Sequence, residues 1–389
     1  MRILIITPWC DDIDLETCKG TPESAYLLKA LLEKGHEVTY ICQGSEEQIP
    51  SNIKHQQHLE IIPIHPFILL KPAKINYLLN PFRLKKYGEY LGGIIEHYLV
   101  ALRYQVIYNI GCYGHLVLRE LSRRYHIPYA IKTMGTFHFE EIREKAYRKY
   151  QYYKEHIAFS VQADHYLLVD DGTKTYAVAK YYGIPDSNIT LLPNPKPAQL
   201  IPEIRKTTKP VIGYFSRFDK LKGTDLFCRI AKAVLKSFSS PRFIIAGDGP
   251  MRPHIENLKK MFPERVEYLG FLEHRKLIQY YSQIHILVST NRYSNLTLPV
   301  IEALSSGIPV IAFNTQETGK LLKHNFNSLL VKPFEVRDFV KSILDLCQHD
   351  ELLERLSKGA METGQSIPTW EERINKEVSK LEELAGEVL

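Results

Sequence analysis

Short apolar runs alternate with amphipathic stretches along the first half of the chain. The first run covers residues 3–6, and residues 23–34 then carry apolar side chains at helical spacing until Gly35 ends the stretch. Further apolar runs lie at residues 38–42, 106–108, 129–131 and 166–169. Strands that alternate with helices are typical of a parallel sheet covered by helices on both faces.

The alternation stops near residue 192 and restarts at residue 211. The intervening segment is rich in proline and charge, which is typical of a linker. New apolar runs follow at residues 211–214, 243–246, 266–269, 284–288 and 309–312. We therefore predict an α/β protein with two doubly wound, Rossmann-like domains, residues 1–197 and residues 205–369. Ligands bind beyond the carboxyl ends of such strands, so we expect the site in a cleft between the two domains.

Length and composition agree with two domains of ordinary size. The chain has 389 residues, of which 44% are apolar and 24% charged. No apolar stretch reaches the roughly 18 residues that a membrane-spanning helix needs. The opening residues MRILIITPW predict a buried strand rather than a signal peptide, so we expect a cytoplasmic protein. The six cysteines contain no CxxC pair, so no metal site is predicted from them.

The charge of the first domain is unevenly placed. Residues 51–154 hold 16 Lys and Arg against 7 Asp and Glu, whereas residues 1–50 hold 4 against 9. Residues 71–90 and 143–154 mix these basic side chains with Tyr, Phe and Leu. This pattern favours peripheral contact with the anionic inner face of the cell membrane. A groove for an acidic polysaccharide and an ordinary solvated helix are the alternatives; nucleic acid is disfavoured because no recognition motif accompanies the charge.

The loop after the first apolar run of the second domain carries candidate phosphate-binding groups. In GYFSRFDKLKG, Arg217 offers a planar fork of donors and Lys222 a compact charge. Gly223 allows close approach of the backbone, and the helix that starts at about Thr224 adds oriented N–H groups. A solvated basic loop is the alternative interpretation.

A second candidate stretch covers residues 294–310. It predicts a turn, a helix with Pro299 in its first turn, and a stop at Gly307. The amide groups of residues 296–298 could cradle an anion. Glu302 could accept hydrogen bonds from two vicinal hydroxyls, such as those of a ribose. Alternatively, its charge only complements the helix dipole.

Taken together, these stretches resemble a known enzyme family. AGDGP at residues 246–250, LGF at residues 269–271 and EALSSGIPVIA at residues 302–312 follow the Arg217 loop in the order seen in retaining glycosyltransferases of family 4, which have the GT-B fold. The resemblance is strong over residues 205–335. It is fainter in the first half, at GHEVT (residues 35–39) and LPN (residues 192–194).

The resemblance implies roles for individual residues. Arg217 and Lys222 would bind the donor diphosphate and offset the charge on the leaving nucleotide, so neither a metal nor another cofactor would be required. Glu302 would hold the ribose. A helix over residues 370–389, starting at Trp370, would cross back to the first domain, which would bind the acceptor. The implied donor-binding positions are Gly20, Gly213, Gly247, Gly270, Phe271, Ser294, Leu296, Thr297 and Leu298.

Two departures from the family pattern affect the donor sugar. Ser294 stands where the family has the first Glu of its E-x7-E block. Met134 stands where the family often has a His, with His138 four residues later. His138 either substitutes for the missing histidine or is an ordinary surface residue.

The leading hypothesis is transfer of a sugar, with retention, from a nucleotide-diphosphate sugar to a hydroxyl. UDP is favoured as the nucleotide, and the acceptor would be a lipid-linked saccharide or a polysaccharide precursor. A nucleotide-sugar epimerase shares the fold and the nucleotide pocket. A non-catalytic nucleotide-sugar-binding protein is the third hypothesis, because the first Glu is missing.

Overall fold

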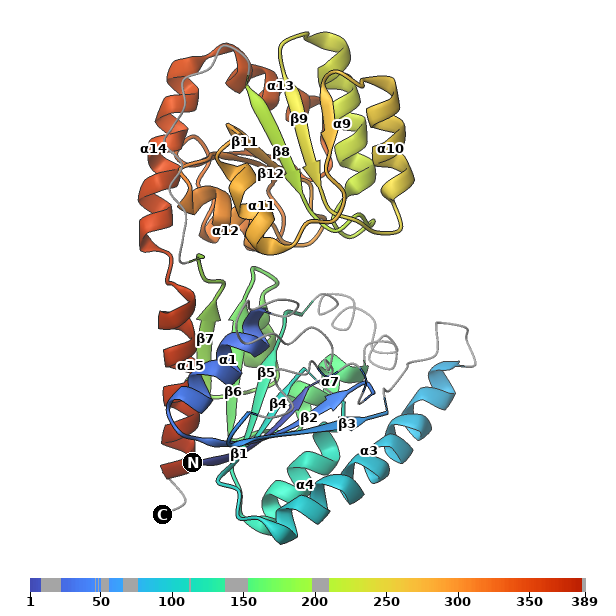
Figure 1. Ribbon diagram of the computed structural model, residues 1–389, viewed down its shortest axis with the longest axis vertical. Helices are drawn as coiled ribbons and strands as arrows, with labels where there is room; N and C mark the ends of the chain where they lie inside the picture. Colours follow the sequence, from blue (N-terminus) through green and yellow to red (C-terminus); the bar gives the residue numbers. More distant parts are fainter. Residues whose placement is uncertain are drawn as a thin grey trace. The chain divides into compact units, whose positions relative to one another are not determined.

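The computed structural model describes residues 1–7, 22–45, 47, 49, 56–65, 76–111, 113–136, 153–197 and 210–386 (Figure 1). The chain divides into two compact units. Unit 1 comprises Met1–Asp170, Lys174–Pro193 and Glu371–Leu389, and unit 2 comprises Asp171–Thr173 and Asn194–Trp370. The division falls at Asn194 rather than at residue 197, and the turn Asp171–Thr173 belongs with unit 2.

Unit 1 is built on a parallel sheet with the strand order β3-β2-β1-β4-β5-β6-β7. Its strands are β1 (Arg2–Thr7), β2 (Glu37–Gln43), β3 (Leu59–Ile64), β4 (Val106–Ile110), β5 (Tyr129–Thr133), β6 (His165–Asp170) and β7 (Ile189–Pro193). The order reverses direction between β1 and β4. This doubly wound topology is the predicted one.

Helices cover the sheet of unit 1, and aromatic side chains such as Tyr108, Tyr129 and Tyr166 are fully buried in its core. The α-helices among the described residues of this unit are α1 (Pro22–Glu33), α3 (Asn76–Ala101), α4 (His115–Tyr125), α7 (Tyr153–Ser160) and α8 (Thr175–Tyr181), together with α15 (Trp370–Gly386) from the C-terminal end of the chain. A 3-10 turn, η2 (Asp186–Asn188), precedes β7. No described helix of the chain is long and apolar enough to cross a membrane.

Unit 2 repeats the same topology with the strand order β10-β9-β8-β11-β12-β13. Its strands are β8 (Val211–Phe215), β9 (Arg242–Ala246), β10 (Val266–Tyr268), β11 (Ile286–Ser289), β12 (Val310–Phe313) and β13 (Ser328–Val331). Its helices are α9 (Thr224–Ser237), α10 (Arg252–Met261), α11 (His274–Tyr281), α12 (Leu298–Ser305), α13 (Val336–Gln348) and α14 (Asp350–Ser366), with the 3-10 turn η3 (Thr318–Lys320).

A buried cluster of charges fixes α15 to the sheet of unit 1. The Nζ of Lys132, on β5, lies 2.8 Å from both carboxylate oxygens of Glu377 and 2.8 Å from Glu23. Arg373 also pairs with Glu23, and the hydroxyl of Tyr108 donates to Glu377 at 2.6 Å. Burial alone would raise the pKa of Glu23, but Lys132 and Arg373 lower it to about 2. The last helix is thus held by ion pairs as well as by its apolar face.

Candidate active site

Two loops of unit 2 meet where the strand order reverses. Strand β8 pairs with β11, so the loops that follow these strands lie next to each other at the carboxyl edge of the sheet. They enclose a small pocket with a volume of about 120 Å³. Its lining includes Arg217 and Lys222 from the first loop, Thr290 and Asn291 from the second, and Thr297 just before α12. The structure therefore brings the two predicted cations to the position where doubly wound sheets bind ligands.

The turn after β9 packs against the loop that carries Arg217. The amide of Phe218 donates to the carbonyl of Asp248 at 2.7 Å. A Cβ atom on Gly247 would lie 1.8 Å from the carbonyl oxygen of Ser216, so the two backbones approach as closely as only glycine allows. Gly247 was predicted to bind the donor; here it lies against the loop that carries Arg217.

Thr290 holds the other end of the same loop. Its hydroxyl lies 3.0 Å from the carbonyl oxygens of Lys222 and Gly223. Gly223 has a positive φ of 70°, and a Cβ there would lie 2.1 Å from the carbonyl oxygen of Thr290. Any other residue at position 223 would push the two loops apart and move Lys222.

The two cations of the pocket act on each other, and the carboxylates of Asp219 and Asp171 act on them. Arg217 donates to Asp219 at 2.5 Å, and the amide of Lys222 donates to the same carboxylate at 2.8 Å. Burial and the neighbouring Arg217 lower the pKa of Lys222, although Asp219 and Asp171 oppose this. Burial would raise the pKa of Asp219, but the Lys222 amide and the Arg217 guanidinium hold it below its usual value. Two cations that repel each other form a site suited to an anion with more than one charge.

Glu302 lies in α12, outside the lining of this pocket, and both of its carboxylate oxygens are already hydrogen-bonded. Oε1 accepts from Nε2 of His274 at 2.6 Å, and Oε2 accepts from the hydroxyl of Tyr281 at 2.5 Å. The side chain of Glu302 is only 3% exposed, whereas that of His274 is 40% exposed. The carboxylate is thus fixed in position, and His274 covers its outer side.

Ser294 and the following turn are occupied by contacts within unit 2. The hydroxyl of Ser294 donates to the carbonyl of Asp171 and lies 3.2 Å from the amide of Leu296. Gly172 packs so closely here that a Cβ would lie 2.4 Å from the Ser294 hydroxyl oxygen. Gly172 is therefore needed beside Ser294, since any Cβ at position 172 would clash with the serine hydroxyl. The amide of Leu296, predicted to cradle an anion, bonds instead to Ser294.

Asp171 shapes the turn that reaches Ser294. Its Oδ1 accepts hydrogen bonds from the amide and the hydroxyl of Thr173, at 3.1 and 2.5 Å.

Among the residues that the structure describes, no group of three or more His, Cys, Asp or Glu side chains could hold a metal ion.

The other predicted donor-site residues of unit 2 are spread over three places. Gly213 lies inside β8, where a Cβ would lie 2.5 Å from Ile284, so its small size serves strand packing. Gly270 and Phe271 precede α11, and Phe271 is 75% exposed. Thr297 and Leu298 form the start of α12, with Thr297 as its N-cap.

In unit 1, Met134 directly follows β5 and is half-buried. Gly20 and His138 lie outside the described residues, so their predicted roles stay predictions.

Sequence reasoning missed several residues that shape the site: Asp219, His274, Tyr281 and Thr290. Asp219 stands between the two predicted cations, so its spacing was a usable signal. His274 and Tyr281 come from α11, and only the packing of α11 on α12 brings them to Glu302. Nothing in the linear pattern points to that contact.

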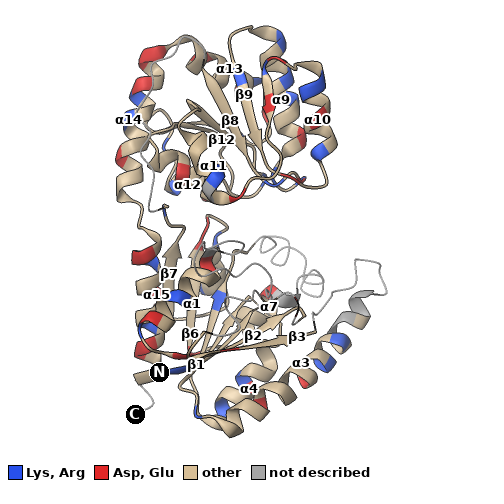
Figure 2. Ribbon diagram, viewed as in Figure 1, with Lys and Arg blue, Asp and Glu red and all other residues tan. Residues whose placement is uncertain are grey.

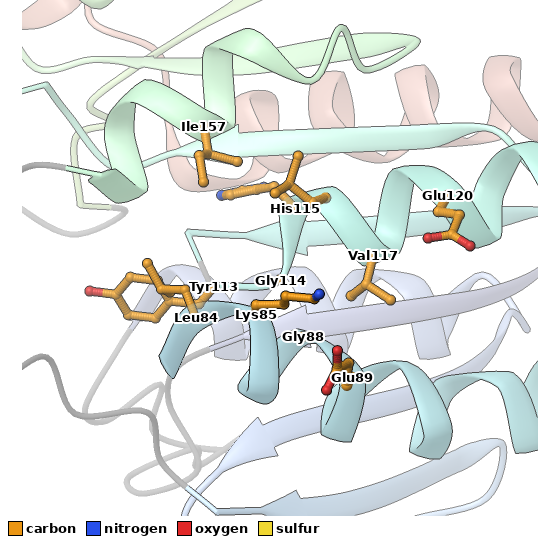
Figure 3. A pocket seen from close by; sticks show the side chains of 11 residues that line it. Leu84, Lys85, Gly88, Glu89, Tyr113, Gly114, His115, Val117, Glu120 and Ile157 are labelled. Atoms are coloured by element: carbon orange, nitrogen blue, oxygen red, sulfur yellow. The ribbon is translucent and has the colours of Figure 1, made fainter. Parts of the chain in front are cut away.

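Unit 1 contains a separate hollow of about 290 Å³ between α3, α4 and α7 (Figure 3). Leu84 and Gly88 line it from α3, Val117 from α4 and Ile157 from α7. Charged side chains, among them Lys85, also line it. The hollow is mainly apolar and lies beside the basic helix that the sequence singled out.

Two doubly wound parallel sheets, one with a basic pocket at its switch point, define the class as a protein of the GT-B type. Two family models match successive parts of the chain: Glycosyltransferase Family 4 over residues 24–196 and Glycosyl transferases group 1 over residues 197–363. The chain belongs to the GT-B glycosyltransferases of the family 4 type.

Known proteins of this class resemble the chain in sequence and structure. The alpha-D-kanosaminyltransferase of Streptomyces kanamyceticus is 27% identical over 154 residues, which cover 39% of this chain and 40% of that protein. The matches span about a third to two fifths of the length of the first curated relatives. Sucrose-phosphate synthase from Thermosynechococcus elongatus superposes with a TM-score of 0.74 at 19% identity, covering 98% of both chains. Anabaena HepE in complex with UDP gives a TM-score of 0.68 at 14% identity, covering 98% of this chain and 100% of that one.

Proposed function

We propose that the protein transfers a sugar from a nucleotide-diphosphate sugar to a hydroxyl acceptor, with retention of anomeric configuration. The observation that carries the proposal is the pairing of Arg217 and Lys222 in one pocket at the switch point of unit 2. Two cations at this position can bind the diphosphate and stabilise the negative charge that grows on the leaving nucleotide. The similar HepE structure, which contains UDP, favours UDP as the nucleotide.

We assign the neutralisation of the diphosphate to protein side chains rather than to a metal. The side chain of Arg217 is 65% exposed, so it can reorient to contact a ligand. Lys222 lines the same pocket. The hydrogen bond from the Lys222 amide to Asp219 stabilises the loop, and it remains when Arg217 turns away from Asp219 to bind the ligand.

A thermal-shift panel tests the nucleotide proposal. A ligand that binds only the native state raises the melting temperature. We expect UDP-sugars to raise it more than GDP- or ADP-sugars, and we expect the shift to persist in EDTA. If no nucleotide sugar stabilises the protein, the assigned pocket is wrong.

We further propose that α3 places unit 1 on an anionic membrane, where a lipid-linked acceptor would be presented. Leu79 and Phe82 are 46% and 58% exposed on this helix, and Lys86 lies 4.9 Å above the ring of Phe82. Arg83, which is half-buried, and the exposed Lys85 add charge on the same helix; Figure 2 shows the Lys and Arg positions of α3 in blue. Exposed apolar and basic side chains on one helix suit the interface of a bilayer.

Neutralising this helix should weaken membrane binding. Each Lys or Arg near an anionic surface contributes about 1 kcal/mol. The triple variant Arg83→Gln, Lys85→Gln and Lys86→Gln should therefore bind vesicles containing phosphatidylserine on the order of 100-fold more weakly in a sedimentation assay at low salt. Lys71 and Lys74, which belong to the same basic segment of the sequence, lie outside the described residues.

Three exposed lysines of unit 2 provide the matched control. The variant with glutamine at Lys232, Lys259 and Lys260 loses the same charge and should pellet with vesicles like the wild type. An acidic polysaccharide groove would instead make the α3 variant defective on soluble acidic acceptors. If the wild type does not pellet with anionic vesicles at low salt, the membrane proposal fails.

A further inference from the structure

The outer side of the Glu302 carboxylate is covered by a histidine. Tyr281, which bonds to Oε2, is fully buried and packs edge-to-face on Phe215 with ring centroids 5.1 Å apart. His274, which bonds to Oε1, is the first residue of α11 and remains 40% exposed. A ligand that approaches Glu302 from solvent therefore meets His274 and not Tyr281.

The hydrogen bond places a hydrogen on Nε2 of the imidazole, in its neutral and in its charged form alike. An ionised carboxylate only accepts hydrogen bonds, so Nε2 of His274 carries the hydrogen. A ribose hydroxyl also binds a carboxylate by donating to it. His274 and a ribose hydroxyl are thus both donors to the same carboxylate, and His274 lies on its solvent side, where the ribose would have to approach.

We propose that His274 covers Glu302 in the nucleotide-free protein and gives up this hydrogen bond when the ribose of the donor binds, so that donor binding releases a proton. The inference rests on the proposed function, since it takes Glu302 as the ribose acceptor. It makes His274 a residue that couples donor affinity to pH in the neutral range.

The direction of the coupling follows from the groups around His274. Glu302, on α12, is the charged group that acts on it from the packed neighbouring helix. Its hydrogen bond raises the pKa of His274, while burial works in the opposite direction. Glu273, Arg275 and Lys276 flank His274 in the chain, and Tyr281 shares the carboxylate. When the ribose displaces His274, the imidazole loses its partner and its pKa falls. Donor affinity therefore rises with pH from the ordinary histidine pKa up to the raised one, and is constant above it.

Titration calorimetry at one pH in two buffers with different ionisation enthalpies measures the protons released. The probe is the nucleotide sugar that gives the largest thermal shift, because its diphosphate diester is fully ionised near neutral pH and adds no titration of its own. The wild type should release a fraction of one proton, and its affinity should rise by up to tenfold per pH unit within this window. His274→Gln keeps a neutral donor for Glu302 but cannot titrate, so its affinity should not change with pH.

His254→Gln is the matched control, because His254 lies exposed in α10 of the same unit. It should retain the proton release and the pH profile of the wild type. Equal proton release in the wild type and in His274→Gln, or no release in the wild type, would overturn the inference. Absence of binding to every nucleotide sugar would instead defeat the proposed function, and the two failures are distinguishable.

Discussion

Arg217→Ala and Lys222→Ala should each lower donor turnover by about two orders of magnitude or more. This is the scale expected when a group that stabilises charge in the transition state is removed. Both side chains line the pocket at the switch point of unit 2, and no other described lysine or arginine lines it. Release of free nucleoside diphosphate, followed with a coupled assay, measures the effect.

The fold should survive both changes, for different reasons. Arg217 is mostly exposed and pairs with the nearby Asp219, so its loss removes little packing. Lys222 holds the loop through its backbone amide and carbonyl, which the alanine variant keeps. Arg229→Ala, in the following helix α9, is the control and should turn over normally. If both pocket variants keep near-normal turnover with an unchanged melting temperature, the diphosphate does not bind here.

Lys132→Met should destabilise unit 1 by about 3–5 kcal/mol, because removing one partner of a buried ion pair leaves the others uncompensated. Lys132 and Glu377 are both completely buried, and Glu23 also depends on Lys132. Since every 1.4 kcal/mol is a factor of ten, amides of β5 and α15 should exchange with deuterium on the order of 10²–10³ times faster.

An exposed ion pair of the same unit provides the control. Lys180 lies 3.1 Å from Asp186, with side chains 40% and 68% exposed. Lys180→Met should cost less than about 1 kcal/mol, as is usual for surface pairs. Equal exchange rates in the two variants would show that the buried cluster does not hold α15.

The same cluster predicts a pH dependence. Glu23 has a folded pKa of about 2 against an ordinary value of 4.5, so its stabilising contribution is complete above the ordinary value. It is lost as the pH falls from there towards 2. In Lys132→Met the free energy of unfolding should therefore fall less between pH 4.5 and pH 2 than in the wild type.

The central strands of both sheets could be predicted from the sequence, whereas three of the four edge strands could not; the edge strand β10 was predicted. Central strands such as β1, β4 and β8 each contain a short apolar run, because parallel sheets bury both faces. The three strands that the pattern missed, β3, β7 and β13, are all at sheet edges. Pro63 interrupts β3 and Pro193 ends β7, and an edge strand tolerates proline where a central strand does not.

The candidate site likewise contains residues that the sequence could reveal and residues that only the structure could reveal. Arg217 and Lys222 could be found because they lie close together in one loop. The partners of Glu302 could not, because His274 and Tyr281 are 28 and 21 residues away and reach it only through helix packing. The role of Gly172, where a Cβ would clash with the Ser294 hydroxyl, also depends on tertiary structure.

The central claim, sugar transfer from a nucleotide-diphosphate sugar, is tested most directly by product analysis. Purified protein is incubated with an α-linked UDP-sugar, a saccharide acceptor and EDTA, and the mixture is followed by NMR. We predict the release of UDP together with a new glycoside in which the α configuration is retained. A new isomer of the donor without UDP release would identify an epimerase, and binding without any product would identify a binding protein; either result would contradict the proposed function.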